Sequence, residues 1–287
     1  MKHLPHYRPL FGGALNSVIT SRDQGIVHPE HPDFTQSIEA LLEMSRAEFI
    51  LAQSLAMKTD VADVCAGAEL EPSAAMPKFL RTKNKADAVL YPAGGIDTGL
   101  LRGKVAALIM VADSPGITVF DPDRDVVGFA NGSMECLDPP DGSNGIVAKM
   151  IEQMKAAGSN PKHIMMVVSA CARACCFGYD MSTAQNAPRA ARLTNRYGSD
   201  VLTPSIVYPP RTGNGIDLGL VAKRQAEASG VEPDAIVIDD VCTAHDGTVA
   251  GSVEQGRFFS GVRGAKMGAK QNPPVPYNER QALLVWA

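Results

Sequence analysis

The stretch from Val105 to Asn131 constrains the fold more than any other part of this sequence. Its apolar runs are rich in Val, Ile and Ala and are separated by Asp, Pro and Gly, in the order KVAALIMVAD, SPGITVFDPDRD and VVGFAN. Short apolar runs bounded by turn residues are typical of buried strands. We therefore predict three strands, the last two joined by a turn, with Ser114 and Asn131 at strand ends.

The rest of the chain mixes helical and strand patterns. Near-helical spacing of apolar residues over 33–57, reaching Phe49 and Leu55, predicts a helix that begins at a cap on Thr35 or Ser37. Two more helices are predicted within 146–158 and 216–230, and further strands within 85–94, 161–172, 234–246 and 281–287. Strands and helices alternate without the regularity of a doubly wound sheet. We predict a mixed α/β fold in which residues 1–287 form a single unit.

Composition narrows the class of protein. A net charge of −4 leaves no basic stripe for nucleic acid, and no apolar run reaches the length of a membrane span. The first residues contain no uninterrupted apolar segment of the kind that a secretory signal needs. The six cysteines have no regular spacing, and Cys175 and Cys176 are adjacent, which is typical of a reducing compartment. We therefore expect a cytoplasmic protein with neither nucleic acid nor membrane as a partner.

Three polar residues follow predicted strands where functional groups are often presented. They are Cys65 in VADVCAGAE, Ser114 in VADSPG and Asn131 in GFANGS. Buried thiols often act as small apolar groups, and Ser before Pro and Asn before Gly are ordinary turn residues. Residue chemistry alone favours this structural interpretation over a catalytic one.

The chain resembles the laccase-domain family, which was first described as polyphenol oxidases and is now regarded as zinc-dependent purine nucleoside phosphorylases. The resemblance follows SVITSRDQGIV, KADAVLY, VADSPGITVFDPDRDVVGFAN, VVSACARACCFGYD and DDVCTAH with RFFSGVR, in that order. It includes the seventeen-residue step from Ser114 to Asn131. The resemblance implies a laccase-domain fold, with central mixed β-sheets flanked by helices.

The same resemblance exposes a departure at the site. In the family, one cysteine and two histidines bind zinc, and the positions that match them here are Cys65, Ser114 and Asn131. Neutral serine and asparagine side chains are poor zinc ligands. Glu135 stands where the family has an arginine suited to an anionic group, and a carboxylate there repels phosphate. We therefore expect no cofactor at the family site and no zinc-dependent phosphorolysis.

Two rewired sites remain open. Ser114 or Cys65 could serve as the nucleophile of a metal-free hydrolase, which needs a base, and His163 and His245 are the candidates for Ser114. Alternatively, a zinc or iron–sulfur site could be built from CARACC and CTAH, whose candidate ligands are Cys171, Cys175, Cys176, Cys242 and His245. The family carries cysteines in these two stretches as part of its architecture.

Three classes of function follow from these observations. The first is a divergent family member with a degenerate zinc site, which binds a nucleoside-like or cell-wall-precursor ligand or acts as a partner-binding pseudoenzyme. The second is a working enzyme, either a purine nucleoside phosphorylase or deaminase with a non-standard metal site or a metal-free hydrolase. The third is a purely structural interaction protein, whose cleft would be filled by side chains.

Overall fold

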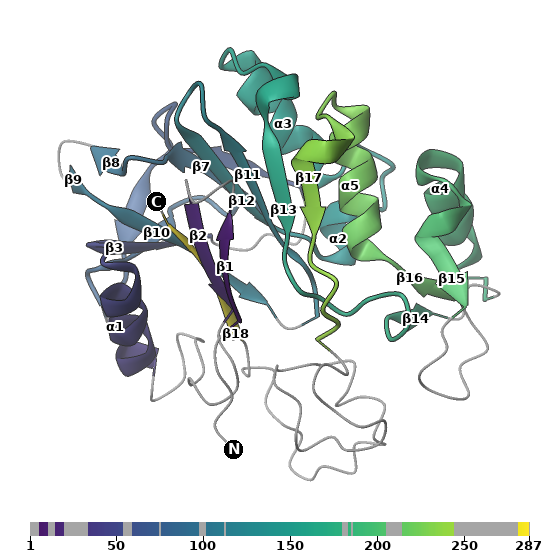
Figure 1. The fold of residues 1–287 in the computed structure, drawn as a ribbon, viewed down its shortest axis with the longest axis horizontal. Helices are drawn as coiled ribbons and strands as arrows, with labels where there is room; N and C mark the ends of the chain where they lie inside the picture. The colour runs from purple at the N-terminus through teal and green to yellow at the C-terminus, as the bar shows by residue number, and fades with distance from the viewer. Residues whose placement is uncertain are drawn as a thin grey trace, which may run out of the picture.

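The computed structural model arranges the chain in four layers, from the helix α1 (Phe34–Ser45) through two packed β-sheets to a group of helices (Figure 1). The structure describes residues 6–10, 15–19, 34–53, 59–74, 76–97, 102–111, 113–179, 183–184, 186–204, 214–243 and 281–286. Within these ranges, no helix has the length and apolar character that crossing a membrane requires. The predicted mixed α/β fold is confirmed.

The first sheet has seven described strands, with the predicted strand at 105–111 in its centre. Their order is β1 (His6–Leu10), β2 (Leu15–Ile19), β18 (Gln281–Trp286), β10 (Val105–Val111), β3 (Phe49–Ala52), β6 (Phe79–Thr82) and β5 (Leu70–Pro72). Strand β10 runs parallel to β3 and antiparallel to β18, so the sheet is mixed.

The second sheet has six described strands and carries the predicted pair of strands joined by a turn. Their order is β17 (Ile236–Ile238), β13 (Met165–Val168), β11 (Gly116–Asp121), β12 (Val126–Asn131), β7 (Ala88–Pro92) and β4 (Val61–Asp63). Strands β11 and β12 form an antiparallel hairpin that pairs Gly116 with Asn131 at one end and Asp121 with Val126 at the other.

Alternation along each strand divides its side chains between two apolar cores. Val127 and Phe129 of β12 pack between the sheets against residues such as Ala107 and Ile109 of β10. Ala130 faces the opposite side, toward the helices. Because successive side chains of a strand point to opposite faces, a strand buried on both faces reads as a continuous apolar run. This explains why the segments that were predicted as strands have no polar face.

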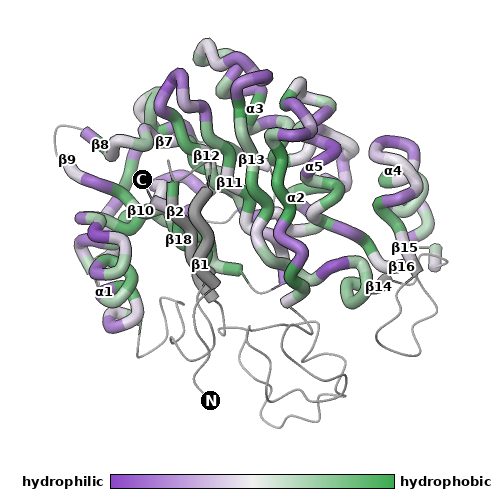
Figure 2. Tube along the Cα trace, in the orientation of Figure 1, coloured by the Kyte–Doolittle hydropathy of each residue, from purple (hydrophilic) through white to green (hydrophobic). Residues whose placement is uncertain are grey.

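Helices cover the outer face of each sheet. On the six-stranded sheet lie α2 (Met134–Leu137), α3 (Ile146–Ala156) and α5 (Leu218–Ala228), whereas α1 packs on the seven-stranded sheet. In Figure 2 the strands of the six-stranded sheet are largely green, while purple segments concentrate in the surrounding turns and outer helices. Asp217 caps α5 by accepting the N–H of Leu220, and Gly230 follows its end with a φ of +99°.

Smaller elements complete the described chain. They are the sheet of β14 (Gly178–Tyr179), β16 (Asn214–Ile216) and β15 (Leu202–Pro204), the hairpin of β8 (Ile96–Asp97) and β9 (Arg102–Gly103), the helix α4 (Ala187–Tyr197), and 3-10 turns at Pro161–His163, Ser199–Val201 and Pro233–Ala235. Ion pairs from Arg189 and Arg192 to the buried carboxylate of Asp138 connect α4 to the end of α2.

The helix predicted across 33–57 is wrong in its extent. It ends at Ser45, where the hydroxyl donates back to the carbonyl of Leu41 and the next residue, Arg46, adopts a left-handed φ of +53°. Phe49 begins β3 instead, because the apolar run FILA pairs with both β10 and β6. Thr35 and Ser37 lie inside the helix and do not cap it, and Leu55 lies outside the described residues.

Candidate functional site

Ser114 and Asn131 lie at the same end of the six-stranded sheet, and we call this pair the serine–asparagine edge. Gly116, at the start of β11, pairs with Asn131 at the end of β12. The N–H of Gly132 donates to the carbonyl of Pro115 at 2.8 Å, and a Cβ on Gly132 would come within 2.7 Å of the Pro115 ring. The two loops are therefore in direct contact.

The polar atoms of Asn131 hold the local backbone together. Its Oδ1 accepts the N–H of Ser133 at 2.9 Å, and its own N–H donates to the carbonyl of Asp87 at 3.0 Å. Ser133 in turn caps α2 by accepting the N–H of Cys136. The Ser114 hydroxyl is half-buried and makes no hydrogen bond to another described residue. A neutral hydroxyl and an amide oxygen that is already hydrogen-bonded do not fit a zinc ion.

Cys136 lies beside the serine–asparagine edge and was not singled out by sequence reasoning. Burial raises the pKa of its thiol to about 12. The hydrogen bond from Ser133 lowers this pKa, whereas the charges of Asp87 and Glu135 raise it further. The thiol is therefore neutral at physiological pH, because burial in apolar surroundings disfavours the thiolate.

Cys65 is not brought together with Ser114 and Asn131. It follows β4, which runs parallel to β7, and the N–H of Val64 donates to the carbonyl of Leu90. The end of β7 pairs with Val126, the first residue of β12. Cys65 therefore lies at the opposite end of β12 from Asn131, where it lines a cavity of about 380 Å³ with Asp63, Arg124 and Asp125.

His163 is also remote from Ser114. It precedes β13, in which Met165 pairs with Phe120 near the far end of the β11–β12 hairpin. Its Nδ1 contacts the carboxylate of Asp123. The structure thus does not support His163 as a base for Ser114, and His245 lies outside the described residues.

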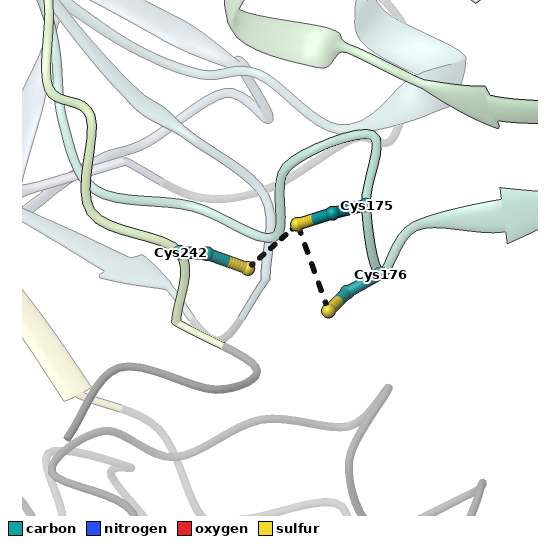
Figure 3. Close-up of side chains that lie close together, drawn as sticks. All are labelled: Cys175, Cys176 and Cys242. Atoms are coloured by element: carbon teal, nitrogen blue, oxygen red, sulfur yellow. Dashed lines mark hydrogen bonds between the residues drawn. The ribbon is translucent and has the colours of Figure 1, made fainter. Parts of the chain in front are cut away.

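Three of the cysteines that the sequence analysis named as metal candidates converge. We call Cys175, Cys176 and Cys242 the thiol cluster, since their sulfur atoms all lie within 4.8 Å of one another. The Sγ of Cys175 is 3.8 Å from the Sγ of Cys176 and 3.8 Å from that of Cys242. Figure 3 shows Cys175 and Cys176 on one loop and Cys242 on another, with the side chains pointing toward one another.

The thiol cluster lies near the serine–asparagine edge, at the same end of the sheet. Its two loops follow β13 and β17, which are parallel neighbours, and Cys171 forms a bridge to Cys242. The N–H of Ala172 donates to the carbonyl of Asp113 at 2.8 Å, and the hydroxyl of Thr243 donates to the carboxylate of Asp113 at 3.2 Å. Asp113, which directly precedes Ser114, therefore connects the two groups.

Burial and a nearby cation set the electrostatics of the thiol cluster. For Cys175, the hydrogen bond with Cys176 lowers the pKa, but the hydrogen bond with Cys242 and burial outweigh it and raise the pKa to about 11. Hydrogen bonds with Cys175 and Cys242 raise the pKa of Cys176, and burial raises that of Cys171. Arg173 donates its backbone N–H to the Sγ of Cys242, and its guanidinium pairs with Asp217 at 2.9 Å.

Gln53 is a second residue that sequence reasoning missed. It directly follows β3, its side chain is buried, and neither its Nε2 nor its Oε1 has a hydrogen-bond partner among the described residues. Strand β3 is parallel to β10, so the chain that leaves Gln53 and the chain that leads to Ser114 emerge at the same end of the seven-stranded sheet. The signal in the sequence was a lone polar residue after the apolar run FILA.

Comparisons with known proteins place this arrangement in context. Residues 80–270 match the profile of the family described as multi-copper polyphenol oxidoreductase laccase. No curated protein matches the sequence. Three solved structures are similar in fold. The hypothetical protein YfiH of Bacillus licheniformis is 14% identical with a TM-score of 0.62, and YlmD from Geobacillus stearothermophilus is 15% identical with a TM-score of 0.61; each match covers 95% of this chain and 92% of that chain. Protein NMB0706 of Neisseria meningitidis is 17% identical with a TM-score of 0.59, and the match covers 100% of this chain and 99% of that chain.

Proposed function

The chain belongs to the multi-copper polyphenol oxidoreductase laccase family, and from this premise we propose that it is a divergent member that binds a small neutral nucleoside without zinc-dependent phosphorolysis. The observation that carries the proposal is the state of Asn131, whose Oδ1 accepts the N–H of Ser133 and is thereby committed to the turn into α2. An imidazole at this position would offer zinc a strong donor, whereas the amide offers none.

The negative charge of Glu135 beside this edge also disfavours the binding of phosphate as a second substrate. Glu135 lies in the first turn of α2, and its charge contributes to the raised pKa of Cys136. Phosphate recognition ordinarily uses an arginine, which can donate two parallel hydrogen bonds to the anion. A carboxylate at the equivalent position repels the anion instead, so we expect phosphorolysis to be lost even if a nucleoside binds.

Neutral hydrogen-bonding groups support a neutral ligand. The Ser114 hydroxyl is half-buried without a partner among the described residues, and the Gln53 amide presents an unpaired donor and an unpaired acceptor. Buried polar groups are normally hydrogen-bonded, so the unpaired amide of Gln53 points to a ligand that completes it. A nucleoside, with its hydroxyls and base edge, suits these groups better than an anionic cell-wall precursor. We also propose that the protein resides in the reducing cytoplasm, where its six thiols persist.

Calorimetric titration of the full-length protein with adenosine and inosine tests the binding step. We expect saturable binding of at least one nucleoside by the wild type, weakened by Ser114→Ala and unchanged by Cys65→Ser at the opposite end of the sheet. The absence of binding by either nucleoside overturns the ligand assignment.

A product assay with phosphate and added zinc tests the chemical step. We expect neither free base nor deaminated product above the uncatalysed level. Zinc-dependent release of free base that Ser114→Ala abolishes would show that the family chemistry is retained, and it would overturn the proposal.

A further inference from the structure

The spacing of the three sulfur atoms in the thiol cluster matches the spacing of ligands around a tetrahedral metal. Zinc–sulfur bonds of about 2.3 Å at tetrahedral angles separate neighbouring sulfur atoms by about 3.8 Å. The Sγ atoms of Cys175 and Cys176, and those of Cys175 and Cys242, are each 3.8 Å apart. The third pair lies within 4.8 Å and needs only a small inward movement. We propose that Cys175, Cys176 and Cys242 bind one zinc ion.

The backbone holds the two loops of this site in fixed positions. Strands β13 and β17 pair in parallel, and the N–H of Thr243 donates to the carbonyl of Cys171 at 3.0 Å. On the other side, β16 passes so close to the loop that a Cβ on Gly215 would lie 1.6 Å from the carbonyl oxygen of Ala174. A site whose ligands are held in place before the ion arrives loses little conformational entropy on binding.

The surroundings of the thiol cluster offset the charge that binding would create. Each thiol that ligates zinc gives its proton to solvent, and three thiolates around a divalent ion carry one net negative charge. The backbone N–H of Arg173 donates to the Sγ of Cys242, and its guanidinium, which pairs with Asp217, also interacts electrostatically with Cys175. Sulfur ligands that accept hydrogen bonds from the backbone are stabilised as thiolates.

Two other interpretations of the thiol cluster make different predictions. All six cysteines are reduced, and 3.8 Å is well beyond the bonded sulfur–sulfur distance of about 2.05 Å, so a disulfide requires an oxidant and movement of both loops. The thiols could instead only fill apolar space, since Cys176 and Cys242 pack with Ala172 and Phe177.

The proposed metal site uses neither Ser114 nor Asn131. Its test is therefore independent of the test for nucleoside binding.

Elemental mass spectrometry of untagged full-length protein, dialysed against zinc buffer and then against metal-free buffer under reducing conditions, tests the proposal. We expect about one zinc per chain in the wild type, and loss of most of that zinc in Cys175→Ser, Cys176→Ser and Cys242→Ser. Cys65→Ser is the matched control and should keep the wild-type content. A wild type without zinc, one that retains only copper, or one whose zinc survives all three substitutions overturns the proposal.

A second measurement keeps the test decisive if a variant folds poorly. Cobalt(II) added to the apo wild type should produce the near-ultraviolet charge-transfer absorption of cobalt–thiolate bonds, and added zinc should abolish it. Zinc should also protect three thiols of the native protein from a disulfide reagent. Absence of both the absorption and the protection shows that the thiols only pack together.

Discussion

The serine–asparagine edge and the thiol cluster are neighbours that differ in the donor atoms that their side chains offer to a metal ion. At the edge, Asn131 is committed to a turn through its hydrogen bond from Ser133, and the remaining polar group is a neutral hydroxyl. In the thiol cluster, three sulfur atoms converge at ligand spacing beside a cation. The comparison teaches that candidate metal ligands are recognised by the donor atoms that the fold brings together, rather than by a match to a motif along the sequence.

The largest effect should come from a substitution that displaces the thiol cluster. In Gly215→Ala the new Cβ would overlap the Ala174 carbonyl, so β16 or the cysteine loop must move. We expect the free energy of unfolding to fall by about 3 kcal/mol, because overpacking a tight interior destabilises the fold. We also expect the bound zinc to be lost. Urea unfolding and elemental analysis measure the two effects.

Gly132→Ala is the matched control at the serine–asparagine edge, where the new Cβ would meet the Pro115 ring at 2.7 Å. It should also destabilise the protein, yet leave the zinc content unchanged. Equal zinc loss in both variants would contradict the independence of the two regions.

A smaller effect is expected from removing the cation beside the thiol cluster. Arg173→Leu breaks a partly buried ion pair with Asp217 and a hydrogen bond to the carbonyl of Asp239. We expect the free energy of unfolding to fall by about 2 kcal/mol, which is less than for a fully buried pair because this pair is only partly buried. We also expect zinc to bind about tenfold more weakly in a competition assay. Arg192→Leu, which breaks the pair with Asp138 away from the cluster, should cost stability but not zinc affinity. Equal zinc affinity in the two arginine variants would show that the Arg173 charge does not stabilise the bound thiolates.

Removing the turn hydrogen bond of Asn131 at the serine–asparagine edge should have a still smaller effect. Asn131→Ala deletes the acceptor for the N–H of Ser133, and we expect the free energy of unfolding, measured by heat or urea, to fall by about 1 kcal/mol. Asn131→Asp keeps an acceptor oxygen and should restore most of the stability. Neither variant should change the zinc content, and zinc loss on Asn131→Ala would move the metal from the thiol cluster to the edge.

Elements with strong local patterns could be predicted from the sequence. The strands at 105–111 and 126–131 and the helix at 146–156 follow from apolar periodicity and turn residues that act over a few positions. The resemblance to the laccase-domain family is confirmed by the profile match. That residues 1–287 form one unit stays a prediction.

Features that depend on distant contacts could not be predicted. Strand β3 was read as helix because its pairing partners, β10 and β6, lie far along the chain. Helix α4 was missed because it is mostly polar: among its residues, only Leu193 and Tyr197 are buried. The separation of Cys65 from Ser114 and Asn131 could not be predicted either, since only the parallel pairing of β4 with β7 places Cys65 in the fold.

The smallest effect is expected for the reactivity of Cys65. Measuring it compares a thiol at the far end of the sheet with the thiol cluster. Burial, followed by the charge of Asp63, raises the pKa of Cys65 from 9.0 to about 11, so its thiolate fraction at pH 8 is about a hundredfold smaller than that of an ordinary thiol. Its alkylation rate, followed by mass spectrometry, should rise with pH until about pH 11, and Asp63→Asn should increase the rate severalfold at pH 8. Added zinc should slow the alkylation of the thiol cluster and leave Cys65 unaffected. Protection of Cys65 by zinc would mean that the ion binds beside the cavity at the opposite end of β12. The thiol cluster would then not differ from the serine–asparagine edge in its ability to bind zinc.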